Sequence, residues 1–397
     1  MARPTRWIRG LLAAPALAIL VAAGILGCRK EKAPVKIGIP LPLSASSADN
    51  GIMLRAAFTT YAEDVNKSGG IKGHPLQVDF ADDQGNATRA TALSEQFVSE
   101  GSLCLMGCNS TTEALAVKSV ASRRKTPFLA TGGAAVAVAT PVDPWTFQII
   151  SNDEDICQDI LKILIDDLQV KKPSILFVNN DWGSGGRDLY VKFLKAKYNM
   201  QFAGMEACET ATLNLVPQML RLKKSGADSV ILWTSIEKVP TALKAMMKAD
   251  FKVTAMSNLA CTLTNFAKTG NLPIRNISHA IWSWDRPDAL AVCDRLSQIT
   301  GRNMKYENLW ASAWVAMQVF TDAIKRADLS LDPKNIDADR EKLRQAIENT
   351  QGLSVLHGTE GATVDFSPSN HRGYALKYYV SKETHNGVDW QIYKASK

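Results

Sequence analysis

One stretch of the sequence, residues 103–133, has the pattern of a complete strand–helix–strand unit. Its first apolar run, Leu103–Met106, predicts a buried strand. Ser110 and Glu113 then stand at the spacing of a capping box, which marks a helix N-terminus. Apolar residues recur at helical spacing up to a second apolar run, Pro127–Ala130. The stretch therefore predicts two strands of one α/β sheet, joined by a helix.

The carboxyl ends of both predicted strands carry hydroxyl groups and free backbone N–H groups. Ser110 and Thr111 follow the first strand, and the segment Thr131–Gly132–Gly133 follows the second. Ligands bind at this edge of open α/β sheets, and a helix N-terminus offers N–H donors to an anion such as a carboxylate. Helix capping and turn formation alone account for the same residues, so this stretch leaves both interpretations open.

Predicted strands and helices alternate twice along the chain. The first series of strands covers residues 35–40, 77–80, 103–106, 127–130 and 145–150, and the second covers residues 174–178, 202–207, 229–233, 253–257 and 277–283. Helical stretches follow at 288–299, 309–327 and 337–349, and short strands at 362–366, 374–380 and 390–393. Such alternation indicates parallel sheets, and 397 residues that are 46% hydrophobic suffice for two cores. We expect an α/β fold of two doubly wound, Rossmann-like lobes.

The first 28 residues have the pattern of an export signal. Arg3, Arg6 and Arg9 form a basic region, and residues 11–26 form an apolar run that is too short for a typical membrane span. The run ends in a segment similar to a bacterial lipobox, although its Leu26 is bulkier than the small residue usual there. We predict a signal peptide over residues 1–28 with lipidation at Cys28. Ordinary signal cleavage and an uncleaved anchor are the alternatives.

Charge and composition exclude several classes of function. The formal charge of +7 includes the three arginines of the signal, so the remainder carries only +4, and no basic run with interleaved aromatics suggests nucleic acid. The motifs G-x-S-x-G, H-E-x-x-H and G-x-x-x-x-G-K-[ST] are absent, and the five histidines are scattered. We therefore expect no enzyme, no catalytic residues, no cofactor and no metal. Six cysteines beyond Cys28 permit disulfides in an exported protein, and Cys104 and Cys108 could close a small loop.

The segment at residues 66–73, NKSGGIKG, and the segment at 82–85, DDQG, resemble a signature of type I periplasmic binding proteins. The resemblance is to the branched-chain amino acid group, the receptors of ABC importers. It implies two lobes joined by a three-segment hinge, with crossings near Ile150–Ser151, Trp282–Trp284 and residues 355–363. Lobe 1 would then comprise residues 35–150 and 284–355, and lobe 2 residues 151–283 and 356–397.

The same resemblance implies a ligand site between the lobes. The family holds a ligand carboxylate with a hydroxyl at the helix start after the third strand and with N–H groups after the fourth strand. Trp182 matches a position where the family stacks an aromatic residue on the ligand, although a packed rim residue is the alternative. Plain turn chemistry is as good an explanation for Asn50, Thr234, Ser235 and Asn258. The predicted ligand-binding residues are Asn50, Ser110, Thr111, Thr131, Gly132, Gly133, Trp182, Thr234, Ser235 and Asn258.

One departure from the family bears on the ligand. Amino-acid-binding members place a carboxylate after the strand that matches residues 253–257, where it pairs with the ligand's ammonium, but this chain has Ser257-Asn258-Leu259-Ala260 there. A buried ammonium without a counter-charge is costly. Either Asp285 or Asp181 replaces the missing acid, or the ligand is an amide, a urea-like compound or an organic acid. The sequence favours a ligand with a carboxylate or an amide.

The leading hypothesis is an extracytoplasmic, membrane-anchored lipoprotein that delivers a small amino-acid-like, organic-acid or amide ligand to an ABC permease of the inner membrane. It would act as a monomer whose lobes close on the ligand. The alternative is a ligand-sensing receptor of the same fold that signals through a partner protein.

Overall fold

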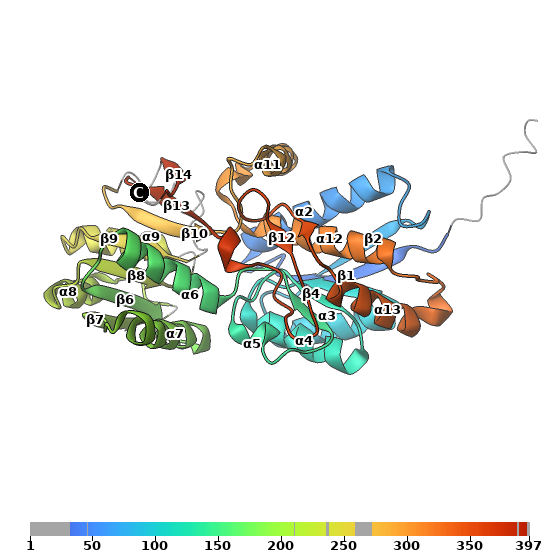
Figure 1. The fold of residues 1–397 in the computed structure, drawn as a ribbon, viewed down its shortest axis with the longest axis horizontal. Helices are drawn as coiled ribbons and strands as arrows, with labels where there is room; N and C mark the ends of the chain where they lie inside the picture. The colour runs from blue at the N-terminus through green and yellow to red at the C-terminus, as the bar shows by residue number, and fades with distance from the viewer. Residues whose placement is uncertain are drawn as a thin grey trace, which may run out of the picture.

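The computed structural model describes residues 32–45, 47–209, 211–235, 238–258, 272–386 and 389–394. The predicted signal peptide and Cys28 lie outside these ranges, as does Cys261. Two α/β lobes lie next to each other, with lobe 1 on the right and lobe 2 on the left of Figure 1. The prediction of two doubly wound lobes is confirmed.

Lobe 1 is built on a parallel sheet of order β2-β1-β3-β4-β5. Its strands are β1 (Val35–Leu41), β2 (Leu76–Asp82), β3 (Cys104–Gly107), β4 (Phe128–Ala130) and β5 (Thr146–Gln148). Its helices are α2 (Ala48–Lys67), α3 (Ala87–Ser99), α4 (Thr111–Arg124), α5 (Val136–Ala139), α11 (Pro287–Thr300), α12 (Leu309–Arg326) and α13 (Ile336–Glu348). Helices α2, α11 and α12 share a core with one face of the sheet, and α3 and α4 cover the other face. Because both faces are covered, the inner strands β3 and β4 are short, fully buried apolar runs.

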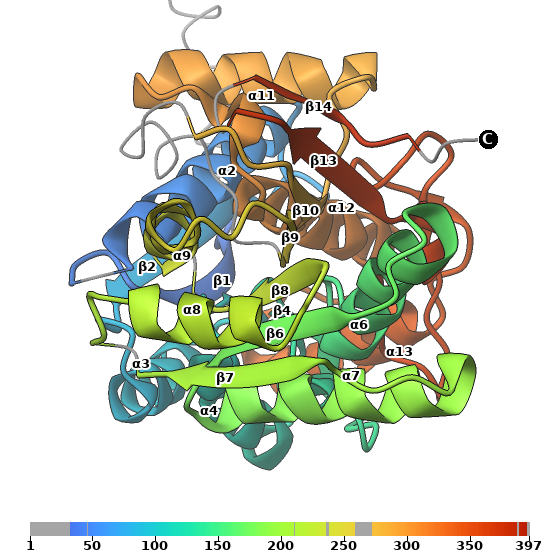
Figure 2. The same ribbon diagram turned by 90° about the vertical axis from the view of Figure 1, so that its left-hand side faces the viewer.

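Lobe 2 is built on a sheet of order β14-β13-β10-β9-β8-β6-β7, which faces the viewer in Figure 2. Its parallel strands are β6 (Pro173–Val178), β7 (Gly204–Cys208), β8 (Ser229–Trp233), β9 (Thr254–Ser257) and β10 (Asn276–Ala280), and its antiparallel edge is β13 (Val380–Thr384) and β14 (Trp390–Ile392). Its helices are α6 (Asp153–Leu161), the π-helical η1 (Lys162–Asp167), α7 (Asp181–Tyr198), α8 (Val216–Lys224) and α9 (Lys238–Lys248). Helices α6 and α7 pack on one face of the sheet, and α8 and α9 pack on the other.

The remaining described elements are short. The strands β11 (Leu353–Ser354) and β12 (Thr363–Val364) form a separate antiparallel pair, and the 3₁₀ turns are η2 (Met304–Tyr306), η3 (Pro333–Asn335) and η4 (Leu376–Tyr378). The strand predicted over residues 374–380 is wrong, because residues 376–378 form η4 and β13 begins only at Val380. Tyr374 is buried in this segment and packs against the half-buried Tyr379 at 4.7 Å, which explains the apolar pattern that suggested a strand.

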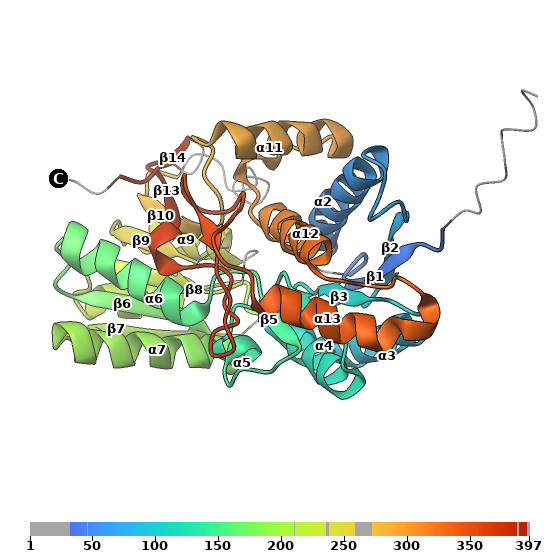
Figure 3. The same cartoon turned by 45° about the vertical axis from the view of Figure 1, so that its right-hand side comes forward.

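Three segments of chain connect the lobes, and the third lies later than the sequence predicted. The first two join β5 to α6 and β10 to α11. Residues 356–373 were assigned to lobe 2, yet Leu356, Val364 and Phe366 belong to the core that contains β1 and α12. His371 also stacks on Phe147 of β5 at 4.1 Å. The third crossing is therefore the segment 374–379, which precedes β13, and the red segment runs between the lobes in Figure 3.

A close helix–sheet contact in lobe 2 positions a tryptophan pair. A Cβ built on Gly186 of α7 would lie 1.9 Å from Nε1 of Trp233, whereas a Cβ on Gly185 would meet nothing within 4 Å. Only glycine at residue 186 lets α7 approach the buried indole of Trp233.

We expect Gly186→Ala to displace Trp233 and to lower the free energy of unfolding by about 1–3 kcal/mol. Gly185→Ala, in the same helix, should raise it by about 0.5–1 kcal/mol, because alanine has the higher helix propensity. Urea denaturation of both variants measures the difference. Equal effects would show that the contact with Trp233 carries no energetic weight.

Candidate functional site: a cleft between the lobes

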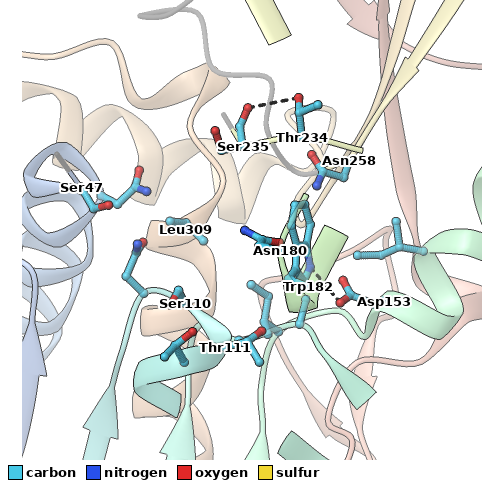
Figure 4. Close-up of a pocket in the computed structure, with 17 residues that line it drawn as sticks. Ser47, Ser110, Thr111, Asp153, Asn180, Trp182, Thr234, Ser235, Asn258 and Leu309 are labelled. Atoms are coloured by element: carbon cyan, nitrogen blue, oxygen red, sulfur yellow. Dashed lines mark hydrogen bonds between the residues drawn. The ribbon is translucent and has the colours of Figure 1, made fainter. Parts of the chain in front are cut away.

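A pocket of about 320 Å³ lies between the two lobes (Figure 4). A volume near 300 Å³ suits a small molecule. The residues that line it are Ser47, Asn50, Asn109, Ser110, Thr111, Thr112, Gly133, Ala134, Ile150, Asp153, Ile156, Asn180, Trp182, Thr234, Ser235, Asn258 and Leu309. Helices α2, α4, α6, α7 and α12 all contribute residues from their N-terminal ends. The pocket therefore lies at a meeting point of several helix N-termini.

On the lobe 1 side, the pocket is formed by the turn from β3 into α4. Ser110 is the N-cap of α4, and its backbone N donates to Oε2 of Glu113 at 3.0 Å. The Ser110 hydroxyl donates to the same carboxylate oxygen. The predicted capping box is confirmed, and it commits the hydroxyl proton of Ser110 to a protein partner.

Thr111 and the loop after β4 complete this wall. The backbone N of Ala135 donates to Oγ1 of Thr111 at 3.4 Å, so the hydroxyl hydrogen of Thr111 is left to donate elsewhere. Gly133 has a φ of +80°, and a Cβ on it would lie 2.6 Å from the Cβ of Ala114. Glycine at this position lets the loop lie close to the first turn of α4.

Thr131 and Gly132 were predicted to contact the ligand, but neither lines the pocket. Thr131 is fully buried, and its carbonyl oxygen accepts a hydrogen bond from Oγ of Ser312 at 2.8 Å. A Cβ on Gly132 would lie 2.6 Å from the carbonyl oxygen of Asn109. Both residues join the loop to the interior of lobe 1. A substitution at Gly132 would therefore disturb the fold before it blocked a ligand.

On the lobe 2 side, Trp182 in the first turn of α7 forms the main wall. Its indole stacks on Trp233 with ring centroids 5.0 Å apart and an interplanar angle of 21°. The edge of Tyr190 supports the Trp233 ring from another side, at 5.3 Å. Trp182 thus packs against Trp233 and also lines the pocket. The sequence had left open whether it is a packed rim residue or a ligand contact, and its position is compatible with both. Thr234, Ser235 and Asn258, at the ends of β8 and β9, also lie in the wall, as does Asn50 of α2.

Asp153 is the principal pocket residue that the sequence prediction missed. It is the first residue of α6, directly after the first crossing segment, and only 4% of its surface is exposed. Its Oδ2 accepts a hydrogen bond from Nε1 of Trp182 at 3.0 Å (Figure 4). Burial raises the pKa of Asp153 from 3.8 to about 7, although the bond from Trp182 opposes this shift.

The two acids that the sequence nominated do not occupy this position. Asp285 is exposed, accepts from the hydroxyl of Ser283 and is absent from the pocket lining. The side chain of Asp181 lies outside the part of the chain that the structure describes. The sequence did hold a signal for Asp153, since Asn152 before it caps α6 through a bond from the backbone N of Glu154 at 2.9 Å. Asn180 was missed likewise, and it caps α7 by accepting from the backbone N of Gly183 at 2.8 Å.

The described cysteines form no disulfide. Cys104, Cys108, Cys157, Cys208 and Cys293 are all free and buried, so the loop proposed between Cys104 and Cys108 is not closed. Burial raises the pKa of both of these thiols. Across the described ranges, no group of three or more His, Cys, Asp or Glu side chains could hold a metal ion. No helix in the same ranges is long and apolar enough to cross a membrane.

Two α/β lobes with a pocket of small-molecule size between them are the architecture of a solute-binding protein. A sequence profile described as "Periplasmic binding protein" matches residues 34–382, and the chain belongs to this family. Members of this family bind solutes outside the cytoplasm and are not enzymes.

Individual relatives are distant in sequence but similar over most of their length. The Leu/Ile/Val-binding protein homolog 3 of Brucella melitensis is 20% identical over 297 residues, which are 74% of this chain and 80% of the relative. A periplasmic binding protein type 1 from Bordetella pertussis Tohama I has a TM-score of 0.78 at 17% identity, covering 91% of this chain and 99% of that one. LivJ from Streptococcus pneumoniae, solved in complex with isoleucine, has a TM-score of 0.76 at 13% identity and covers the same shares of both chains.

The raised pKa of Asp153 predicts how stability depends on pH. Well below pH 3.8 the carboxyl is protonated in both folded and unfolded protein, so burial carries no charge penalty. As the pH rises to about 7, the unfolded form ionises first, and stability is lost.

Asp153→Asn removes this penalty and keeps an oxygen for the Trp182 N–H. We expect the variant to match the parent at about pH 3 and to exceed it at about pH 8 by about 4 kcal/mol at most. Thermal unfolding across this range measures the gap. A stability difference that does not change with pH would mean that it arises from packing and not from the charge of Asp153.

Proposed function

We propose that this protein captures a small amino-acid-like, organic-acid or amide ligand in the cleft and presents it to the permease of an ABC importer. The observation that carries the proposal is the shared lining of the pocket, because α4 of lobe 1 and α7 of lobe 2 both supply walls. A ligand that touches both walls makes some of its contacts only when the lobes are together. Such contacts favour the closed state, which is the state a permease would recognise.

The polar end of the ligand would lie against α4. The first-turn N–H groups of Thr111 and Thr112 have no partner within the helix, and the hydroxyl of Thr111 has a hydrogen to donate. No Lys, Arg or His occurs among the described residues of the lining, so N–H, hydroxyl and amide groups would hold a carboxylate or amide there.

The apolar body of the ligand would lie against Trp182. The indole offers a flat face, and Ile150, Ile156 and Leu309 add aliphatic surface to the same pocket. Ile150 and Asp153 flank the first crossing segment, so a ligand in contact with them also touches the hinge.

The partner, oligomeric state and anchoring belong to the same proposal. Family membership supports association with an ABC transporter. We assign the partner as an inner-membrane permease and this protein as a monomer held at the membrane through lipidated Cys28. Mass spectrometry of the mature N-terminus tests the anchor, and an unmodified residue there would exclude it.

Ligand binding should both stabilise the protein and make it more compact. A panel of aliphatic and aromatic amino acids, their deaminated acids and small amides is screened by thermal shift, because a ligand of the native state raises the melting temperature. Small-angle scattering with each positive compound should show a smaller radius of gyration. A stabilising compound that leaves the radius unchanged would contradict the closure mechanism.

Trp182→Ala should weaken ligand binding by about 10-fold or more and lower stability by about 3–5 kcal/mol, since it leaves a hole beside Trp233. Trp182→Phe, which keeps an aromatic face, should retain more of both. Trp145→Ala is the matched control, because Trp145 packs on the far core of lobe 1 and lies outside the pocket. Calorimetric affinities that fall equally in the Trp182→Ala and Trp145→Ala variants would remove Trp182 from the binding site.

A further inference from the structure

Ser110, at the wall of the pocket, is held from behind by a buried acid. The Ser110 hydroxyl donates to Oε2 of Glu113, and the backbone N of Ser110 donates to the same oxygen at 3.0 Å. Only 3% of the surface of Glu113 is exposed. Toward the pocket Ser110 therefore offers lone pairs, which accept hydrogen bonds. Its hydroxyl can donate to a solute only when its bond to Glu113 is released.

A second acid, Asp83, lies next to Glu113 and is fully buried. The backbone N of Gly85 donates to Oδ1 of Asp83 at 2.8 Å, whereas Oδ2 has no hydrogen-bond partner among the described residues. Gly85 also adjoins Glu113, since a Cβ built on it would lie 3.6 Å from Oε1 of that acid. The preceding Asp82 differs, because three backbone N–H groups and the hydroxyl of Ser44 donate to its carboxylate. Asp83 is thus a buried acid that its described neighbours satisfy only in part.

This environment favours the neutral form of Asp83. Burial raises its pKa from 3.8 to about 6, and the charges of Glu113 and Asp82 add to the shift, whereas the bond from Gly85 opposes it. A protonated carboxyl is also a hydrogen-bond donor, and the carboxylate of Glu113 is an acceptor beside it. The two acids are therefore coupled through one proton.

The other titratable groups around Asp83 leave this coupling visible. Arg89 of α3 opposes the shift, but its guanidinium is exposed and donates to the carbonyl oxygen of Asp82 at 3.4 Å. Cys108, in the turn after β3, is neutral at neutral pH because burial raises the pKa of its thiol. Asp153, on the opposite wall of the pocket, has a pKa raised by burial to about 7, so a test must remove its contribution.

We infer that Asp83 is a positioning residue that makes the cleft bind an anionic solute together with a proton. This inference rests on the proposed function, since it concerns the polar end of the same solute. When Asp83 loses its proton, a negative charge appears beside Glu113, and the Ser110 hydroxyl is held more strongly. The added charge also offsets the partial positive charge of the α4 N-terminus. Both effects weaken the binding of a carboxylate at α4.

A neutral amide responds differently to the same change. Its N–H group can donate to the lone pairs of Ser110 while its carbonyl oxygen accepts from the first-turn N–H groups of α4. The affinity for an acid is full while Asp83 is protonated in the free protein, and it falls as the pH rises through the pKa of Asp83 in the complex. Low pH therefore favours the acid, and high pH favours its amide.

The test compares 4-methylpentanoate with 4-methylpentanamide, which differ only at the polar end. Calorimetry is run on the Asp153→Asn protein, in which the charge of Asp153 no longer contributes. We expect the affinity for the acid to fall by about 5-fold or more from about pH 5.5 to about pH 8, because binding raises the pKa of Asp83 by about one unit. The affinity for the amide should change by less than about 2-fold over the same range.

Two further substitutions in the same protein identify the groups involved. Asp83→Asn imitates the neutral acid, keeps an oxygen for the N–H of Gly85, and should hold the affinity for the acid at its low-pH value throughout. Glu113→Gln should also remove the pH dependence, because Asp83 acts through Glu113. Asp79→Asn, on β2 and outside the pocket, is the matched control and should keep the full fall in affinity.

A measurement without solute shows whether the two acids are coupled. Urea denaturation of Asp83→Asn, Glu113→Gln and the double variant gives the coupling between the two side chains. We expect this coupling to change by about 5-fold or more in the folding equilibrium constant between about pH 5 and about pH 8, since Asp83 is charged only at the higher pH.

Coupling that is the same at both pH values would overturn the inference. So would an affinity for the acid that falls as steeply in the Asp83→Asn protein as in its parent, or a cleft that binds neither the acid nor the amide. In each of these cases, a thermal shift with another compound of the panel would leave solute capture standing. If no compound shifts the melting temperature, the proposed function itself fails, and the inference fails with it.

Discussion

The hydrogen bond from Trp182 to Asp153 connects the parts of the molecule on which the cleft depends. Asp153 begins α6 directly after the first crossing segment, and Trp182 begins α7 and stacks on Trp233 of β8. One bond of 3.0 Å thus joins the hinge to the lobe 2 sheet through the wall of the pocket. This arrangement buries the carboxyl of Asp153 without a positive charge from the protein beside it in the pocket lining. That unbalanced charge makes the stability of the protein depend on pH.

The rest of the cleft follows from parallel strand order. In both lobes the strands end at the edge that faces the other lobe, so the turns into α4 and α7 meet across the pocket. Several helix N-termini come together there, and side chains cap three of them: Glu113 accepts from Ser110, Asn152 accepts from Glu154, and Asn180 accepts from Gly183. The backbone N–H groups alone would make the site suited to anions. The side chains that accept from these groups reduce the number of free donors in the pocket.

Much of this architecture could be predicted from residue patterns alone. The strand–helix–strand unit around α4, the capping box at Ser110 and the glycine turn at Gly133 all rest on local rules of backbone geometry. The lining residues after β3, β4, β6, β8 and β9 followed from the same logic. The error at residues 356–373 had a different origin, because short apolar segments carry no mark of which of two cores they enter.

The sequence by itself determined which elements form and at which edge of each sheet polar residues gather, because periodicity and capping act over a few neighbouring residues. Tertiary structure alone decided which polar residues face the cleft. Thr131 is buried in lobe 1 and Gly132 lies against the backbone of Asn109, whereas Asp153 is buried after the first crossing segment against an indole 29 positions away in the chain. Side-chain direction and burial depend on contacts between distant segments, and the charge of the pocket depends on both.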